Sequence, residues 1–169
     1  MADRVTTRLS GRLGALLLSS GKSLAVAESC TGGLLAGAVT GVPGSSRYFL
    51  GGVVAYHNDA KAGVLGVPHP LIEAFGAVSG EVALAMAEGA LARFDADVAI
   101  ATTGVAGPGG GTRGKPVGTV WVAVADRKGV RRANRHRFGG GREEVRRATV
   151  RAALEAAAAV LSGEGDARD

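Results

Sequence analysis

Apolar and polar positions follow two different periods along this chain. Helical spacing places Val5, Leu9 and Leu13 on one face of a segment at residues 4–20. A short apolar run at residues 23–27 then stops at small hydroxyl residues and glycines, as a buried strand does. Continued along the chain, the pattern predicts further helices at 33–40, 58–65, 71–75, 79–93 and 142–161, and further strands at 48–56, 98–102, 117–125 and 130–138.

The order of these elements indicates the fold class. Helices and strands alternate through the first half, and the last two strands form a hairpin that turns at residues 126–129. The second arm of the hairpin is polar at alternate positions, which favours an edge strand. We therefore expect an α/β fold, a three-layer α/β/α sandwich on a mixed, mostly parallel sheet, formed by a single domain at residues 1–169.

Composition restricts the compartment and the partners. Hydrophobic residues make up 46% of the chain and aromatic residues only 4%, so the core must consist mainly of alanine, valine and leucine. The single cysteine, Cys30, excludes an internal disulfide and fits a reducing compartment. No apolar run reaches the roughly 18 residues of a membrane span, and no secretory signal is evident. We expect a cytoplasmic protein without membrane contact.

The net charge of +5 is concentrated late in the chain, where arginines and lysines crowd residues 127–151. Such a basic stripe is one way to contact nucleic-acid phosphates. The stripe lacks interleaved aromatic residues and any recognisable nucleic-acid module, so a solvated basic face is the favoured interpretation. Nucleic acid is therefore not an expected partner.

A Gly-rich turn links the first strand to the second helix. Ser29, Thr31, Gly32 and Gly33 occupy it, directly before the apolar helix at 33–40. A helix start of this kind presents backbone N–H groups and the positive end of the helix dipole to a ligand. The sequence therefore predicts that these four residues cradle a phosphate or a carboxylate. An ordinary turn that uses serine and glycine for steric reasons is the alternative.

Six motifs carry a resemblance to a known family. In chain order they lie at residues 27–33, 44–46, 55–61, 76–79, 103–108 and 115–120. Together they resemble the CinA C-terminal domain family, which includes stand-alone nicotinamide-nucleotide amidohydrolases (nicotinamide mononucleotide deamidases, PncC type). The resemblance implies a homo-oligomer of two or more copies. It also implies hydrolysis of the carboxamide of nicotinamide mononucleotide to the acid and ammonia, with no metal and no cofactor.

Amide hydrolysis without a metal needs a nucleophile, a base and a group that stabilises the oxyanion. The sequence offers no histidine well placed as a base and no metal-ligand spacing, so we expect a Ser–Lys arrangement. Ser46 is the expected nucleophile, and the resemblance implies a catalytic serine and tyrosine ten residues apart, as Ser46 and Tyr56 are. Ser29 is the rival nucleophile, although its glycine-rich surroundings favour ligand binding.

Lys61 is the expected base, with Tyr56 relaying or orienting the proton. A helix capped by Asn58 would place Lys61 at its third position, where the positive end of the helix and partial burial lower the lysine pKa. Backbone N–H groups near Ser46 or Thr103 would then hold the oxyanion.

Two further segments are expected to bind substrate. Thr103, Gly104 and Gly107 follow a buried strand and are expected to wrap a ligand at the carboxyl edge of the sheet. Arg142 follows three glycines at a helix start, a place suited to the 5′-phosphate or a carboxylate. Two other functions stay open: a competence- or DNA-damage-related interaction protein that binds nucleic acid through its basic face, and a pyridine-nucleotide-binding regulator without catalysis.

Overall fold

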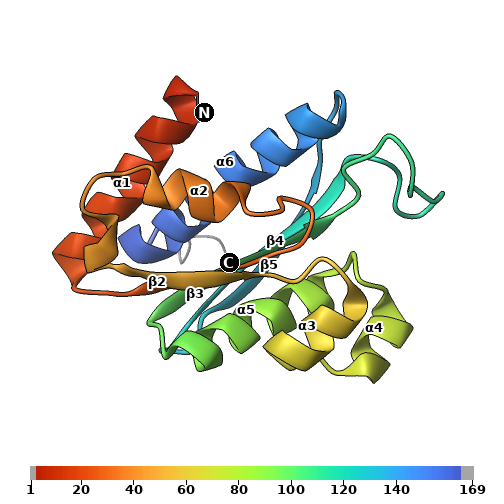
Figure 1. The fold of residues 1–169 in the computed structure, drawn as a ribbon, viewed down its shortest axis with the longest axis horizontal. Coiled ribbons are helices and arrows are strands. Elements are labelled where there is room, and N and C mark those ends of the chain that lie inside the picture. The colour runs from red at the N-terminus through yellow and green to blue at the C-terminus, as the bar shows by residue number, and fades with distance from the viewer. Residues whose placement is uncertain (1–2, 165–169) are drawn as a thin grey trace.

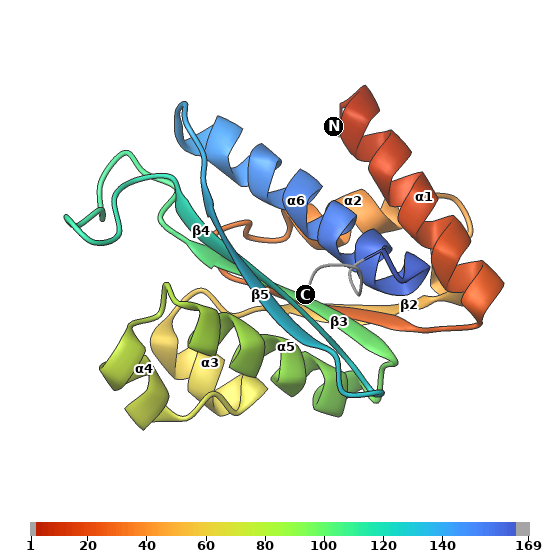
Figure 2. The same cartoon turned by 180° about the vertical axis from the view of Figure 1, so that it is seen from behind.

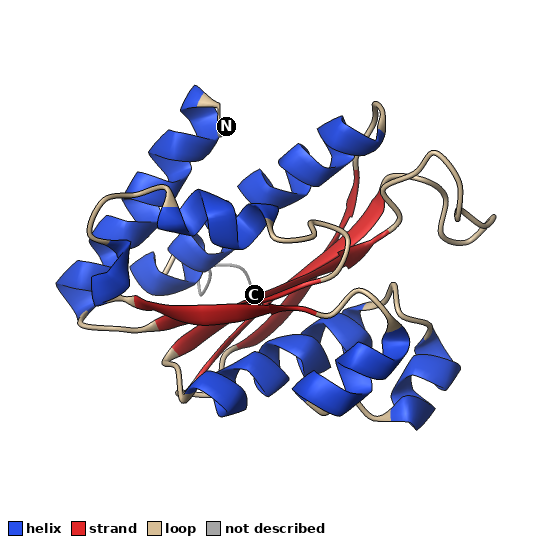
Figure 3. Cartoon of the chain, in the orientation of Figure 1, coloured by secondary structure: helices blue, strands red, loops and turns tan. Residues whose placement is uncertain are grey.

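The computed structural model describes residues 3–164, from α1 near the N-terminus to α6 near the C-terminus (Figure 1, Figure 3). The helices are α1 (Arg4–Ser20), α2 (Leu34–Thr40), the short 3-10 helix η1 (Ser45–Arg47), α3 (Asn58–Leu65), α4 (His69–Phe75), α5 (Gly80–Phe94) and α6 (Arg142–Ser162). The strands are β1 (Leu24–Glu28), β2 (Phe49–Val54), β3 (Val98–Gly104), β4 (Thr119–Asp126) and β5 (Arg131–Arg137).

The predicted helices and strands all occur, with ends shifted by a few residues. The start of α3 differs in a way that affects the site. The N-cap is His57, whose Nδ1 accepts a hydrogen bond from the Asp59 backbone N–H at 3.2 Å, and the helix begins at Asn58. Lys61 is therefore the fourth residue of the helix and not the third, although it still lies in the first turn.

The strands form one mixed sheet in the order β2-β1-β3-β4-β5. β1 is parallel to both β2 and β3, whereas β4 is antiparallel to β3 and β5. All strands except β4 thus point in one direction, and the expected α/β fold on a mixed, mostly parallel sheet is confirmed. Because β2 and β3 lie on opposite sides of β1, the strand order reverses there. Such a reversal leaves a crevice at the carboxyl ends of the strands.

Helices cover both faces of the sheet, so that the molecule has three layers (Figure 1, Figure 2). One face packs on α1, α2 and α6, and the other on α3, α4 and α5. Side chains alternate along the strands, so that in β1 Leu24 and Val26 enter the first core while Ala25 and Ala27 enter the second. β3 repeats this division. The second face of the sheet is therefore formed largely by alanine, which lets α5 approach closely.

The helix α5 also lies very close to the end of α3. A Cβ atom added to Gly89 of α5 would lie 2.0 Å from the Leu65 carbonyl oxygen at the end of α3. No side chain fits in that space, so glycine sets the distance between the two helices. The same helix α3 carries Lys61, which makes this spacing relevant to the site.

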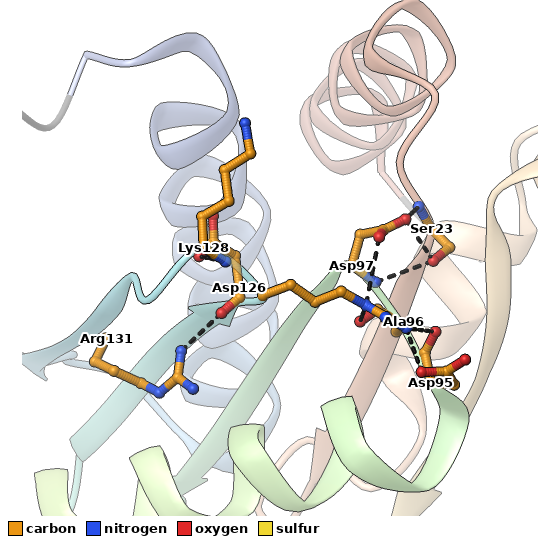
Figure 4. Close-up of polar contacts among 8 residues, drawn as sticks. Ser23, Asp95, Ala96, Asp97, Asp126, Lys128 and Arg131 are labelled. Carbon is orange, nitrogen blue, oxygen red and sulfur yellow. Dashed lines mark hydrogen bonds and ion pairs between the residues drawn. The ribbon is translucent and has the colours of Figure 1, made fainter.

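The amino-terminal edge of β1 and β3 is closed by a polar network, part of which Figure 4 shows. The Asp97 carboxylate accepts hydrogen bonds from the Ser23 backbone N–H at 2.8 Å and the Ser23 hydroxyl at 2.9 Å. The Ser23 backbone N–H is the main reason that the pKa of Asp97 is lowered. Arg127 Nε donates to the Ala96 carbonyl at 2.8 Å. This network fastens the sheet at the edge opposite the crevice.

Between residues 3 and 164, none of the helices combines the length and the apolar character that crossing a membrane requires.

Candidate functional site

The β1–α2 loop, defined here as residues 29–33, is organised by the last residue of β1. The side chain of Glu28 is fully buried, and its Oε2 accepts hydrogen bonds from the backbone N–H groups of Gly33 and Leu35, both at 3.0 Å. Its Oε1 accepts from the Ala36 N–H at 2.8 Å. The anion at the start of α2 is therefore the chain's own carboxylate. The prediction that this helix start cradles a substrate anion is wrong for these N–H groups, because they are already bonded.

Replacing Glu28 with glutamine tests how strongly this carboxylate holds the loop. Glutamine offers one acceptor oxygen and an NH₂ group that opposes the helix N–H donors. We expect Glu28→Gln to lower the free energy of unfolding by about 2–4 kcal/mol, because buried donors lose charged acceptors. Urea unfolding measures the change. The matched control is Glu88→Gln, which removes an exposed ion pair with Arg131 and should cost less than about 1 kcal/mol.

A cavity of about 310 Å³ opens at the carboxyl edge of β1 and β3. It combines hydroxyl groups, two cationic side chains and glycine-rich backbone, and no carboxylate lines it. The lining residues are Ser29, Cys30, Tyr56, Asn58, Lys61, Ala77, Val78, Thr103, Gly104, Val105, Ala106, Gly107, Gly109, Gly110 and Arg142. The crevice left by the strand order and the cavity coincide. Seven residues of the predicted site thus meet in one place: Ser29, Tyr56, Lys61, Thr103, Gly104, Gly107 and Arg142.

Lys61 reaches the cavity from α3 and is only 1% exposed. Its Nζ donates a hydrogen bond to the Tyr56 carbonyl oxygen at 3.1 Å. Burial disfavours the ammonium form and lowers the pKa of Lys61 below its ordinary value of 10.5. A lysine with a lowered pKa, in a cavity that holds a serine, is suited to act as a base.

Ser46 does not lie with Lys61, and the predicted pairing of these two residues is wrong. Ser46 is in η1, before β2 begins, whereas Lys61 comes after β2 ends. The neighbouring Tyr48 carbonyl accepts from the Leu24 N–H at the very start of β1, which fixes η1 at the amino edge of the sheet. The six residues of β2 separate the two edges, roughly 17–20 Å. Ser29, at the end of β1, is the serine that shares the cavity with Lys61.

Tyr56 and Arg142 form one wall of the cavity. Arg142 Nη2 lies 2.8 Å from the Tyr56 hydroxyl oxygen and donates to it, and Nη1 donates to the Gly107 carbonyl at 2.8 Å. Tyr56 contacts Lys61 through its backbone carbonyl and not through its hydroxyl, so the hydroxyl is bonded to the arginine instead of relaying a proton from the lysine. Tyr56 is 59% exposed, which leaves its ring at the mouth of the cavity.

Thr103 lies at the bottom of the same cavity, almost fully buried. Its hydroxyl donates to the Ala77 carbonyl oxygen at 2.8 Å. The hydroxyl proton is thereby used, and the oxygen remains able only to accept a hydrogen bond from a ligand. Gly104 and Gly107 line the cavity with backbone, as predicted for a loop that follows a buried strand.

Thr31, Gly32 and Gly33 do not line this cavity. The Thr31 hydroxyl is bonded to the Thr102 hydroxyl at 2.8 Å in the interior, and the Gly32 N–H donates to the Ser29 carbonyl at 3.1 Å. Gly33 lines a second cavity, of about 530 Å³, which lies among α1, α2 and α6. These three residues therefore shape the turn that carries Ser29 and do not face the site directly. The larger cavity contains neither Ser29 nor Lys61.

Cys30 lies beside Ser29 but has little thiolate character. Its side chain is buried, and burial raises the pKa of the thiol to about 12. Within the described part of the chain, no cluster of histidine, cysteine, aspartate and glutamate has the composition of a metal site. Ser29 is then the candidate nucleophile among the residues that line the cavity.

Several arginines of the basic stripe bond to acidic side chains or carbonyls of the protein itself. Arg127 contacts Asp95, Arg131 contacts Glu88, and Arg151 contacts Asp3 at 2.9 Å. The stripe is also spread over the β4–β5 hairpin and α6. These internal contacts fit the interpretation of the stripe as a structural and solvated surface.

Two residues of the site were not predicted: Glu28 and Arg146. Arg146 Nε donates to the Cys30 carbonyl at 3.1 Å, and its Nη2 donates to the Thr31 carbonyl at 2.9 Å. The sequence did contain a signal for Arg146, because it lies four residues after Arg142 and thus on the same face of α6. The signal for Glu28 was weaker: it is an acidic residue at the end of an otherwise apolar strand.

Comparison with known proteins places this site in a family. The family model of the CinA C-terminal domain matches residues 6–161. A CinA-like protein from Desulfotalea psychrophila is 52% identical over 153 residues, which cover 90% of this chain but 36% of that relative. A CinA-like protein from Mycolicibacterium gilvum is 48% identical over 98% of this chain and 40% of its own length. The chain thus spans little more than a third of the length of these curated relatives.

Solved structures agree with the sequence comparison. A competence/damage inducible protein from Agrobacterium tumefaciens superposes with a TM-score of 0.92 at 45% identity, over 96% of this chain and 98% of that one. A CinA superfamily protein from Klebsiella pneumoniae gives a TM-score of 0.90 at 39% identity, over 94% and 98% of the two chains. The match over nearly the whole chain, together with the shared fold, shows that this protein belongs to the CinA C-terminal domain family.

Proposed function

We propose that this protein is a metal-free amidohydrolase that converts nicotinamide mononucleotide to nicotinate mononucleotide and ammonia, with Ser29 as the nucleophile. The observation that carries the proposal is the shared cavity of Ser29 and the buried Lys61 at the carboxyl edge of the sheet. The resemblance of the motifs to nicotinamide-nucleotide amidohydrolases supplies the substrate.

The proposed reaction has two halves. Lys61, in its neutral form, takes the proton of the Ser29 hydroxyl while the oxygen attacks the carboxamide carbon. The C–N bond breaks, the proton passes from Lys61 to the departing nitrogen, and ammonia leaves an acyl-serine. Water then attacks the acyl carbon with Lys61 again as base, which releases the carboxylic acid and restores Ser29.

The remaining groups of the cavity fit a carboxamide better than a carboxylate at the reacting end. Thr103 keeps only an acceptor, and the NH₂ of a carboxamide is a donor, whereas a carboxylate product offers none. Arg142 supplies a positive charge at the mouth, beside Tyr56, for the phosphate of the nucleotide. The absence of acidic side chains from the lining favours an anionic substrate.

Turnover of nicotinamide mononucleotide tests the proposal. Purified protein should release ammonia and nicotinate mononucleotide in equal amounts, measured by coupled ammonia detection and by chromatography. Arg142→Met should raise KM for the mononucleotide by roughly 10-fold or more, because a charge-assisted contact to phosphate is lost. The same change should leave KM for nicotinamide riboside, which has no phosphate, within about 3-fold.

Other outcomes would favour the other functions. Binding of nicotinamide mononucleotide without ammonia release would indicate a regulator that has the pocket but no catalysis. Salt-dependent binding of DNA with no turnover would indicate a nucleic-acid partner instead.

A further inference from the structure

The β1–α2 loop is held from the side of α6 by Arg146. Its guanidinium donates to two consecutive carbonyl oxygens, those of Cys30 and Thr31. Among residues 3–164 it forms no ion pair with an acidic side chain. A buried carboxylate, Glu28, holds the other end of the same loop by its N–H groups. Two charged side chains thus fix the backbone that carries Ser29.

Two backbone N–H groups of the loop have no acceptor among the described residues. The Ser29 N–H donates to the Thr102 carbonyl at 2.9 Å, the Gly32 N–H to the Ser29 carbonyl, and the Gly33 N–H to Glu28. The N–H groups of Cys30 and Thr31 donate to no other residue between positions 3 and 164. Both residues are buried, and buried amides are rarely left without an acceptor. Of the two residues, Cys30 lines the cavity, so its N–H is the donor available beside the serine.

Arg146 fixes the backbone that directly follows the Cys30 N–H. The peptide bond between Cys30 and Thr31 is trans, so its N–H points opposite to its carbonyl oxygen. Because Arg146 holds the carbonyls of Cys30 and Thr31, the backbone on the C-terminal side of Cys30 is fixed in one orientation. The Cys30 N–H belongs to the residue directly after Ser29, and Cys30 lines the cavity.

We propose that the backbone amide of Cys30 is an oxyanion-hole donor for attack by Ser29, and that Arg146 is the positioning residue that holds the loop around this amide. The proposal rests on the proposed function in taking Ser29 as the nucleophile. When the Ser29 oxygen adds to the carboxamide carbon, the π electron pair moves to the carbonyl oxygen, and the Cys30 N–H binds that negative charge. The expectation that amides near Ser46 or Thr103 do so is replaced.

Variants at Arg146 test the positioning role. Arg146→Met keeps the length of the side chain but removes every donor, and it should lower kcat about 10²-fold while KM stays within about 3-fold, because the oxyanion forms only after binding. Arg146→Lys should give an intermediate kcat. The matched control is Arg147→Met, one residue further along α6, whose side chain bonds to Glu143 and not to the loop; its kcat should be unchanged.

Two additional readouts separate aiming from loss of structure. Methylguanidinium should restore part of kcat to Arg146→Ala and nothing to Arg147→Ala, whereas a loosened fold would not respond. The rate at which an alkyl fluorophosphonate labels Ser29, followed by mass spectrometry, should fall at least about 10-fold in Arg146→Met, since phosphonylation also develops negative charge on oxygen. Should Arg146→Met fail to fold, Arg146→Lys supplies the same measurements.

The outcomes distinguish the two proposals. Wild-type ammonia release combined with an unchanged kcat in Arg146→Met would overturn the inference alone. A wild-type protein that releases no ammonia but labels at Ser29, with slow labelling in Arg146→Met, would overturn the proposed substrate and support the inference. Neither turnover nor labelling in the wild type would overturn both.

Discussion

Ser29→Ala is expected to lower the rate of ammonia release from nicotinamide mononucleotide by roughly 10⁴-fold or more, whereas Ser46→Ala should leave it within about 2-fold. Alanine at position 29 removes the oxygen that would form the acyl intermediate, and no other serine lines the cavity. Ser46 lies before β2, at the other edge of the sheet, and does not line the cavity. The comparison of kcat in the two variants measures the assignment directly.

The pair of serines provides its own control, since the chemical change is identical at both positions. Circular dichroism and thermal unfolding of each variant exclude loss of fold as the cause. A Ser29→Ala protein with appreciable kcat would remove the proposed nucleophile. A large decrease in kcat in Ser46→Ala, with none in Ser29→Ala, would indicate that the reaction takes place at the amino edge of the sheet.

Lys61→Met should lower kcat by about 10³-fold, in the range for removal of a general base. Methionine matches the length of the lysine stem but cannot take a proton. Lys128→Met, the same change on the exposed β4–β5 turn, should leave kcat unchanged. Activity retained in Lys61→Met would exclude the lysine as the base.

The pH dependence of wild type and variant sharpens this test. Because the pKa of Lys61 is lowered, neutral amine forms at a pH below 10.5, and kcat/KM should rise with pH until Lys61 has lost its proton. The unfolded chain binds the proton more tightly than the folded one, so wild-type stability should also rise with pH between the lowered pKa and 10.5. Lys61→Met has no such proton to lose, so we expect it to be more stable than the wild type at neutral pH. This difference in the free energy of unfolding should become smaller as the pH rises from the lowered pKa to 10.5. A parallel course for the two proteins would contradict a lowered lysine pKa.

Hydrophobic periodicity was sufficient to predict the order of elements and the layers. In β1 and β3, successive residues point to opposite faces of the sheet. Leu24 and Val98 therefore enter one core, whereas Ala25 and Ala99 enter the other. The motif after β1 and the loop after β3 were each predicted to bind substrate, and Ser29 and Thr103 line one cavity because the carboxyl ends of parallel strands share one edge.

The same rule, applied strictly, would have excluded Ser46, since a residue that precedes a parallel strand lies at the amino edge. The pairing of Ser46 with Tyr56 and Lys61 rested on spacing along the chain, which does not tell at which edge of the sheet a residue lies. The occupant of the α2 helix start could not be predicted in this way, because periodicity does not tell where a single carboxylate such as Glu28 points. Which backbone N–H groups of the loop are already bonded depends on the folded structure and not on the periodicity of the sequence.

The tight crossing at Gly89 has a consequence beyond packing. α3 carries the buried Lys61 and ends against α5 at one position where no methyl group fits. Natural variation that widened the gap between these two helices would hydrate the lysine and weaken the base while leaving every group in the cavity chemically intact.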